Sequence, residues 1–418
     1  MRILLLNIPN SLNYGSMMMA ENLMRYLGRE IARLPQGPNL TFVIETPKPD
    51  ESVSRFREAL KGSGDWDNFN LETVAPEAIT RKEKLKRYFS WLMTVLFATK
   101  SRTLLPPGAG DVDLVVVLGG DDFSEDYGVL GPVLACLRLA ALRKIGKKVV
   151  MCGQTIGPFH LWRVPAVRWL LGKVNEIMAR DPITQRYLIN ELKLDNAVLV
   201  GDLAFLPLSR EFEKPYLPLA DDYFAIVPSQ LIWAYAKEPI RHEYIEFMVD
   251  ICSYLLNRYP GSQLLILPHV LAPDGADDRL AGRDLLIGLK RIGVSPERLV
   301  FPQEQMLPNQ ARYLIENSRL LITGRMHGSI SSFCVKMPPL VFSYSRKYWG
   351  IIDEYLGMGD LIVDVRHHGW EELRQISKAK LDFILENRDE LVQRMADKLP
   401  AMEKAAMLNI KVLRKELE

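Results

Sequence analysis

The chain has 418 residues, of which 48% are hydrophobic and 25% charged, and its formal net charge at pH 7 is +2. This length exceeds what one hydrophobic core usually serves, so we expect two domains of ordinary globular composition. The small net charge argues against a nucleic acid as the main partner. The four cysteines (Cys136, Cys152, Cys252 and Cys334) lie in apolar stretches without metal-binding spacing. We therefore expect free thiols in a reducing cytoplasm.

The first element is an apolar run, MRILLLNIPN. The run is too short for a secretory signal, so we expect an opening strand. No stretch of the sequence reaches the ~20 apolar residues of a transmembrane helix. We therefore expect a protein of the cytoplasm or of the inner face of the membrane.

Short apolar runs alternate with segments of helical period through the first half of the chain. RILLLNI precedes MMMAENLMRYLGREIA, VDLVVVLGG precedes GPVLACLRLAALRKIG, and KKVVMCGQ precedes VPAVRWLLGKV. Apolar strands separated by amphipathic helices predict a parallel sheet covered on both faces. We expect residues 1–210 to form one Rossmann-like domain.

A second domain follows an irregular stretch. Residues 211–222, EFEKPYLPLADD, have two prolines, mixed charge and no period, which is typical of an interdomain linker. The alternation then restarts and predicts a second Rossmann-like domain over 223–385, followed by a helical segment over 386–418. The fold class is thus α/β, with two doubly wound domains facing a cleft and a C-terminal helix that crosses back to the first domain. In such sheets ligands bind beyond the carboxyl ends of strands.

One strand end in the second half combines several polar residues. LLITG is followed at once by Arg325, His327, Gly328 and Ser329. A guanidinium can bind a carboxylate or phosphate, an imidazole can move a proton near neutral pH, and a helix N-terminus favours an anion. An ordinary ion pair and a turn cap are the alternative, but this combination favours a site for an anionic ligand.

Three strand ends of the first half carry weaker signals. Arg180 follows the strand EIMA and precedes Asp181, and either a ligand contact or an ion pair with Asp181 or Asp202 would explain it. Asp121 and Asp122 follow a Gly-Gly pair, so they could bind sugar hydroxyls, act as a base, or serve as turn and cap residues. Gln154, in CGQTIGPF, could contact a polar ligand.

Two further loops belong to the second half. His269 follows the strand LLIL and precedes Asp277 and Asp278, and without a second nearby histidine we expect substrate contacts and helix capping there, and no metal. Arg346 and Lys347 follow the next strand in SYSRKYWG, close to Arg325 in a parallel sheet. They would add positive charge to the same site.

Residues 81–102 join a basic run to an apolar segment, RKEKLKRYFSWLMTVLFATKSR. The segment could lie at a membrane surface with its lysines and arginines on anionic headgroups. A core helix with a charged first turn is equally compatible, and both interpretations stay open.

Taken together, these loops resemble the polysaccharide pyruvyl transferase family, from NYGS near the start to GDLIVDV. The motifs that carry the resemblance are GQTIGPF, ARD, LPHVLAPDGADD and above all TGRMHGSISSFCVKMPPLVFSYSRK. The resemblance implies a GT-B-like pair of domains. It also implies transfer of pyruvate from phosphoenolpyruvate to a sugar of a polysaccharide or its lipid-linked precursor, usually as a ketal, without cofactor or metal.

The resemblance also implies roles for individual residues. His327 and Arg325 match the catalytic pair, and Arg180 and Lys347 match donor-binding residues. Gly328 and Ser329 are assigned to the donor because they lie at the helix N-terminus. The acceptor, expected in the first domain, is assigned from the loops above to Asn13, Asp121, Asp122 and Gln154, together with His269 of the second domain. The sequence departs from the family pattern at Ser16, where an acidic residue is usual, and at Asp121, where a glycine is common. Both departures concern the acceptor.

Two other functions compete with a pyruvyl transferase. A GT-B glycosyltransferase with a nucleotide-sugar donor would use the same helix N-terminus for a diphosphate. A catalytically silent sugar- or anion-binding protein of the same fold would explain the departures at Ser16 and Asp121. Binding of phosphoenolpyruvate rather than UDP separates the first competitor from the pyruvyl transferase.

Overall fold

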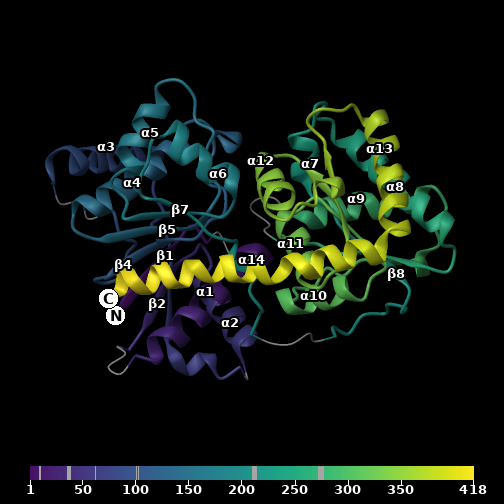
Figure 1. Cartoon of the computed structure of the whole chain (residues 1–418), viewed down its shortest axis with the longest axis horizontal. Coiled ribbons are helices and arrows are strands. Elements are labelled where there is room, and N and C mark those ends of the chain that lie inside the picture. The colour runs from purple at the N-terminus through teal and green to yellow at the C-terminus, as the bar shows by residue number, and fades with distance from the viewer. Residues whose placement is uncertain are drawn as a thin grey trace. The chain divides into compact units, whose positions relative to one another are not determined.

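The computed structural model describes residues 1–8, 11–34, 39–61, 63–99, 101, 103–209, 214–271 and 277–418. The chain forms two compact units (Figure 1). The first unit consists of Met1–Ser11, Ser16–Ser209 and Met402–Glu418, and the second of Leu12–Gly15 and Arg210–Ala401. Part of the linker expected over 211–222 lies outside the described residues, as do two positions of the 81–102 stretch and most of the loop after His269.

The first unit is built on a parallel sheet with the strand order β3-β2-β1-β4-β5-β6-β7. The strands are β1 (Arg2–Leu6), β2 (Thr41–Glu45), β3 (Asn70–Val74), β4 (Leu114–Val117), β5 (Lys148–Gln154), β6 (Glu176–Ala179) and β7 (Ala197–Leu199). Leu4 pairs with Val43 on one side and with Val115 on the other. The order reverses between β1 and β4, which makes the carboxyl ends of these two strands the expected ligand position.

Helices cover both faces of this sheet. They are α1 (Tyr14–Ala32), α2 (Pro49–Leu60), α3 (Arg81–Phe97), α4 (Gly131–Lys144), α5 (Arg163–Leu171) and α6 (Pro182–Arg186). The layer of α3, α4 and α5 packs its apolar side chains, such as Ala140 and Val167, against Val115 and Val117 of β4. The burial of these strands on both faces explains their continuous apolar sequence.

The second unit repeats the plan with the strand order β10-β9-β8-β11-β12-β13. Its strands are β8 (Tyr223–Val227), β9 (Gln263–Ile266), β10 (Leu299–Val300), β11 (Leu321–Thr323), β12 (Pro339–Ser343) and β13 (Ile362–Asp364). Its helices are α7 (Gln230–Ala234), α8 (Arg241–Arg258), α9 (Asp278–Arg291), α10 (Pro308–Glu316), α11 (Met326–Cys334), α12 (Arg346–Tyr348) and α13 (Trp370–Glu386). Both sheets have the Rossmann strand order, so the predicted α/β class with two Rossmann-like domains is confirmed.

The last helix, α14 (Arg388–Leu417), belongs to both units, because its residues from Met402 onward pack within the first. Gly201 allows a close approach there, since a Cβ at this position would lie 2.7 Å from the backbone nitrogen of Ala406. Asn409 donates a hydrogen bond of 2.8 Å to the carbonyl of Gly201. The predicted return of the C-terminal helix to the first domain is therefore confirmed.

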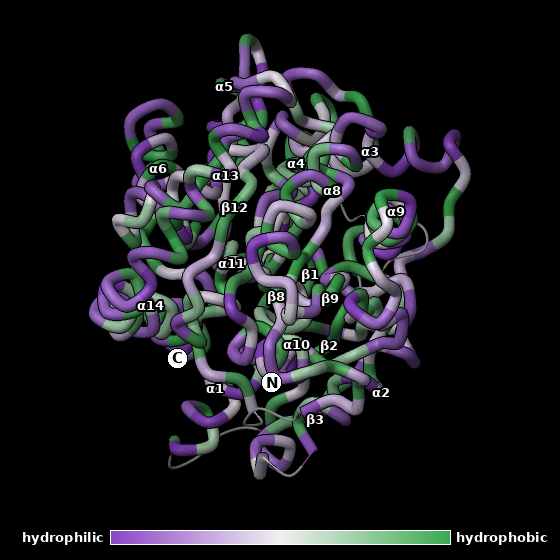
Figure 2. Tube along the Cα trace, turned by 90° about the vertical axis from the view of Figure 1, so that its right-hand side faces the viewer, coloured by the Kyte–Doolittle hydropathy of each residue, from purple (hydrophilic) through white to green (hydrophobic). Residues whose placement is uncertain are grey.

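Hydropathy follows the layers of the fold. In Figure 2 the strands β1 and β9 are green, whereas outer helices such as α9 and α14 alternate green and purple. Across the described residues, no helix combines the length and the apolar character needed to span a bilayer.

Candidate anion-binding site at the strand ends of the second unit

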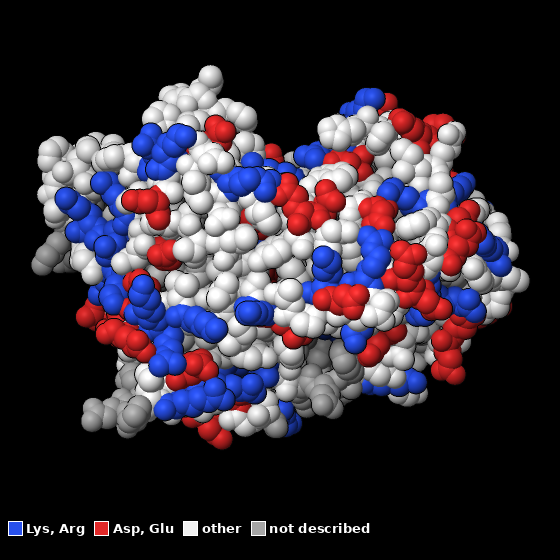
Figure 3. Space-filling view, in the orientation of Figure 1, with Lys and Arg blue, Asp and Glu red and all other residues white. Residues whose placement is uncertain are grey.

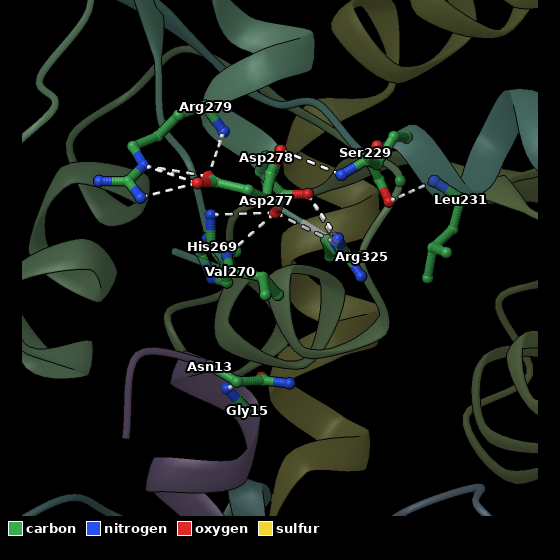
Figure 4. Close-up of polar contacts among 12 residues, drawn as sticks. Asn13, Gly15, Ser229, Leu231, His269, Val270, Asp277, Asp278, Arg279 and Arg325 are labelled. Atoms are coloured by element: carbon green, nitrogen blue, oxygen red, sulfur yellow. Dashed lines mark hydrogen bonds and ion pairs between the residues drawn. The ribbon is translucent and has the colours of Figure 1, made fainter. Parts of the chain in front are cut away.

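The site begins with an ion pair between Arg325, directly after β11, and Asp278, at the start of α9. Nε of Arg325 lies 3.1 Å from both carboxylate oxygens of Asp278, and Nη2 lies 2.5 Å from Oδ1 (Figure 4). The same carboxylate accepts hydrogen bonds of 3.2 and 3.0 Å from the backbone N–H groups of His269 and Val270. Asp278 therefore fixes the guanidinium against the loop that follows β9.

Burial makes this pair electrostatically strong. The side chain of Arg325 is 11% exposed and that of Asp278 is fully buried. Burial alone would lower the pKa of Arg325, but the carboxylate of Asp278 outweighs it, and the pKa is raised above its usual value. The ion pair that the sequence offered as an alternative to a ligand contact thus exists. The carboxylate of Asp278 keeps the guanidinium of Arg325 protonated at the strand end.

His269 is a buried neutral imidazole beside several cations. Burial lowers its pKa to about 3, and the charges of His327, Arg325 and Arg312 act in the same direction. In the part of the chain that the structure describes, Nδ1 of His269 has no hydrogen-bond partner. Positive charge therefore dominates the surroundings of this ring, which favours an anion nearby.

The segment Leu12–Gly15, just before and at the start of α1, forms part of this site. The backbone N–H of Tyr14 donates to the carbonyl of His269, and that of Leu271 donates to the carbonyl of Leu12, both over 3.1 Å. The ring of Tyr14 lies 5.3 Å from that of His269. Asn13 accepts from the N–H of Gly15 over 3.1 Å (Figure 4). The sequence grouped Asn13 with the first domain, whereas a bridge to Val270 ties it to the second unit.

His327, on the first turn of α11, packs against the backbone of Gly15. A Cβ at position 15 would lie 2.1 Å from Nδ1 and 2.4 Å from Cγ of the imidazole. Glycine is thus required by the position of the ring, because any side chain here would displace it. A contact between residues 312 positions apart gives His327 a defined place at the strand ends.

Gly328 and Ser329 face the interior of the unit. A Cβ at position 328 would lie 2.5 Å from Oγ1 of Thr323, so the glycine serves the close packing of α11 on β11. Ser329 is fully buried, and its hydroxyl donates to the carbonyl of Arg325 over 3.4 Å. The sequence assigned both residues to the donor, and the structure gives them contacts within the helix and with its strand.

Lys347, on α12 after β12, is buried among aromatic rings. Its Nζ donates to the hydroxyl of Tyr344 over 3.3 Å and lies 5.0 and 5.6 Å from the ring centres of Tyr344 and Tyr348. These two tyrosines also interact electrostatically with Arg325. The ammonium of Lys347 is attracted to these rings, and the residue therefore lies beside the same two tyrosines as Arg325.

In the first unit, Arg180 forms the other buried ion pair that the sequence considered. It is 1% exposed, its Nη1 lies 2.8 Å from Oδ2 of Asp202, and its Nε donates to Thr155 over 2.9 Å. Burial opposes the charge, but Asp202, Asp121 and Asp181 together raise the pKa of Arg180. Arg180 is thus surrounded by carboxylates.

The remaining residues assigned to the acceptor lie at the strand ends of the first unit. Asp122 accepts a 3.0 Å hydrogen bond from Nδ2 of Asn7, at the end of β1. A Cβ at Gly119 would lie 2.1 Å from the Asp122 carboxylate, which explains the first glycine of the pair. Gln154 is fully buried, and its amide donates to the carbonyls of Val117 and Cys152. Asp121 and Asp122 therefore stand at the point where the strand order reverses.

Sequence reasoning missed two contributors to the second-unit site. Arg312 lies within the apolar pattern of α10, where nothing marks it as a buried cation next to His269. Gly15 lies in the NYGS stretch of the family resemblance, but its packing role depends on His327, a residue of another helix. Among the residues that the structure describes, no group of three or more His, Cys, Asp or Glu side chains could hold a metal ion.

Comparison with known proteins identifies the family. The model of the polysaccharide pyruvyl transferase family matches residues 13–346, which include Asn13, Arg325 and His327 and end one residue before Lys347. The chain belongs to the polysaccharide pyruvyl transferase family. A comparison of its sequence with curated proteins gives no significant match.

Solved structures show the fold of this polysaccharide pyruvyl transferase family member. A UDP-GlcNAc 2-epimerase from Neisseria meningitidis aligns over 99% of this chain and 100% of its own, with 13% identity and a TM-score of 0.57. A proposed UDP-N-acetylglucosamine 2-epimerase from Listeria monocytogenes aligns over 100% and 96%, with 13% identity and a TM-score of 0.60. A glycosyltransferase from Rickettsia africae aligns over 100% and 98%, with 10% identity and a TM-score of 0.52. These similarities establish the GT-B type of fold.

Proposed function

We propose that the protein transfers the pyruvyl group of phosphoenolpyruvate to two hydroxyls of a sugar, forming a cyclic ketal on a polysaccharide or its lipid-linked precursor. The observation that carries the proposal is the positive charge at the strand ends of the second unit. Arg325 and Arg312 surround the neutral His269, Lys347 lies beside the same tyrosines as Arg325, and Asp278 is the carboxylate that pairs with Arg325. Phosphoenolpyruvate carries a carboxylate and a phosphate, which match such a site.

His327 is the acid–base group in this proposal. It protonates the methylene carbon of phosphoenolpyruvate, which leaves an oxocarbenium-like centre at the neighbouring carbon. The first sugar hydroxyl attacks that carbon and returns its proton to His327. Phosphate then leaves, and the second hydroxyl attacks the same carbon while its proton passes to the departing phosphate. One ketal and one inorganic phosphate result.

The other residues hold the anion during these steps. Arg325 is oriented by Asp278, and a guanidinium fixed in this way binds a planar carboxylate without losing much conformational entropy. In this proposal Lys347 binds the phosphate, and its ammonium group acts as a point charge. The neutral His269 packs on Tyr14 and keeps a further proton donor or acceptor within the site.

Thermal unfolding of the purified protein with phosphoenolpyruvate tests the proposal. A ligand at about 100 times its Kd stabilises the native state by ~2.7 kcal/mol, which raises Tm by roughly 5–10 °C for a domain of this size. Lys347→Met, which removes the charge and keeps the chain length, should abolish the shift. Lys398→Met, which removes an exposed lysine of α14, should preserve it.

UDP and inorganic phosphate serve as competing ligands in the same assay. A larger stabilisation by UDP than by phosphoenolpyruvate would contradict the proposal and favour a nucleotide-sugar donor. An equal shift with inorganic phosphate, at matched concentration, would indicate an anion site without selectivity for the pyruvyl donor.

A further inference from the structure

The helix α3 exposes an apolar stripe. Leu85, Phe89, Leu92 and Leu96 follow one another at intervals of four, three and four residues, so they share one face of the helix. They are 66%, 64%, 38% and 49% exposed. Trp91, Thr94 and Val95, by contrast, are buried in the first unit. One face therefore packs into the core, as one of the two sequence interpretations requires, while the other remains open to solvent.

Basic side chains flank the stripe at the start of the helix. Arg81, Lys82, Lys84 and Lys86 are exposed and form no ion pair within the described ranges of the chain. The other charges of this turn are already engaged: Glu83 completes a capping box with Thr80, and Arg87 pairs with Glu77. The four cations thus remain available for an external negative surface.

Two neighbouring loops extend the apolar surface. α3 packs on α4, and α4 packs on α5, within one layer over the sheet (Figure 1). Leu130, directly before α4, and Trp162, directly before α5, are each 57% exposed, and Leu161 is 80% exposed. The N-termini of these helices follow the carboxyl ends of β3, β4 and β5, so Leu130, Leu161, Trp162 and the basic first turn of α3 lie toward the same edge of the sheet. Asp122 lies at that edge as well.

We propose that this face, formed by α3 and the loops before α4 and α5, docks on a lipid bilayer that contains anionic phospholipids. Leu, Phe and Trp side chains enter the interfacial region, and the lysines bind the headgroups. A protein partner is a poorer match, because lysines are depleted from the centres of protein interfaces. On the face of the second unit that Figure 3 shows, acidic and basic side chains are interspersed, as on a solvated face. This proposal goes beyond the pyruvyl transfer and does not depend on it.

Vesicle flotation with the full chain tests the docking. The protein should float with vesicles of phosphatidylcholine and phosphatidylglycerol, remain unbound with phosphatidylcholine alone, and be released by high salt. Each lysine near an anionic surface contributes about fivefold to binding, so Lys82→Gln/Lys84→Gln/Lys86→Gln should weaken it roughly 100-fold. The matched control Lys398→Gln/Lys404→Gln/Lys411→Gln neutralises three exposed lysines of α14 and should bind as wild type.

Apolar variants complete the test. Phe89→Ser/Leu96→Ser should weaken vesicle binding at least tenfold, whereas Ile287→Ser/Ile292→Ser, at exposed positions on or directly after α9, should leave it unchanged. Equal binding to both vesicle types, or no binding to either, would overturn the proposal. So would a wild-type dimer in sedimentation equilibrium that Phe89→Ser/Leu96→Ser converts to a monomer, because the stripe would then be an interface between copies of the chain.

Discussion

Gly15→Ala is the substitution that most directly tests the geometry of the site. The new Cβ would lie 2.1, 2.4 and 2.8 Å from Nδ1, Cγ and Cε1 of His327. Since such atoms pack best at about 3.5 Å, the imidazole has to move by roughly 1.4 Å. Overpacking costs about 1–3 kcal/mol, and alanine recovers about 1 kcal/mol over glycine within α1. The net loss of stability should be small, about 0–2 kcal/mol.

The loss of activity should be much larger than the loss of stability. A catalytic group displaced by about 1 Å can cost 10²-fold in rate, close to the ~10²–10⁴ expected when an acid–base group is removed. Turnover is measured as phosphate released from phosphoenolpyruvate with an acceptor that the wild type uses. Gly131→Ala is the control, because a Cβ there meets nothing within 4 Å.

Urea denaturation of the double variant isolates the contact. In the His327→Ala background the ring is absent, so Gly15→Ala should cost nothing and instead stabilise by about 0.5–1 kcal/mol. An equal cost of Gly15→Ala with and without the ring would refute the packing of His327 on Gly15. Full activity of Gly15→Ala would refute the role of a precisely placed imidazole.

Three further outcomes follow from the buried charges. Asp278→Asn leaves Arg325 buried without its partner and should cost about 3–5 kcal/mol of unfolding free energy, measured in urea. Burial lowers the pKa of His269 to about 3 in the native state, whereas its value in the unfolded chain is near 6.5. Between these two pH values the imidazole is protonated in the unfolded state and neutral in the native state. The free energy of unfolding therefore falls as the pH drops. When the pH is lowered from 6.5 to 5, the wild type should lose ~2 kcal/mol of unfolding free energy through His269. The His269→Leu variant should not show this loss, and urea denaturation curves at both pH values measure the difference. Arg180→Met should destabilise by about 3–5 kcal/mol, and adding Asp202→Leu should restore part of that loss in the same assay.

The fold was largely predictable from sequence because parallel strands are apolar on both faces. Runs such as LVVV of β4 and LLIT near β11 are readable without knowledge of their neighbours, and the helices between them impose the crossover connections. The strand-end rule then directs attention to Arg325 and His327 before any coordinates are known. The return of α14 was also expected, since no strand follows α13.

The partners of the site residues were not predictable in the same way. Arg325 and Asp278 are 47 positions apart, and Asp278 also looks like an ordinary first-turn residue of α9. Arg312 is concealed in an amphipathic pattern, where a charged residue usually faces solvent. Such contacts depend on how separate helices pack on one sheet. The hydrophobic period of a single helix or strand carries no information about that packing.

The charges around the buried arginine differ between the two units. This difference affects which kind of ligand each unit can bind. Arg325 has Asp278 as its ion-pair partner, while Arg312 and His327 lie near the same loop. Buried ion pairs contribute little net stability, so their value here is the orientation and the sign of the local potential. An anionic donor is favoured at such an edge.

Around Arg180 the balance is reversed, because Asp202, Asp121 and Asp181 all act on the guanidinium. A further anion would meet these carboxylates as well as the arginine, and its binding would be weakened accordingly. Neutral hydroxyls, by contrast, can donate hydrogen bonds to carboxylates such as Asp121 and Asp122. From this charge balance we propose that Arg180, which the sequence assigned to the donor, supports the strand ends of the first unit, and that this edge suits a sugar better than phosphoenolpyruvate.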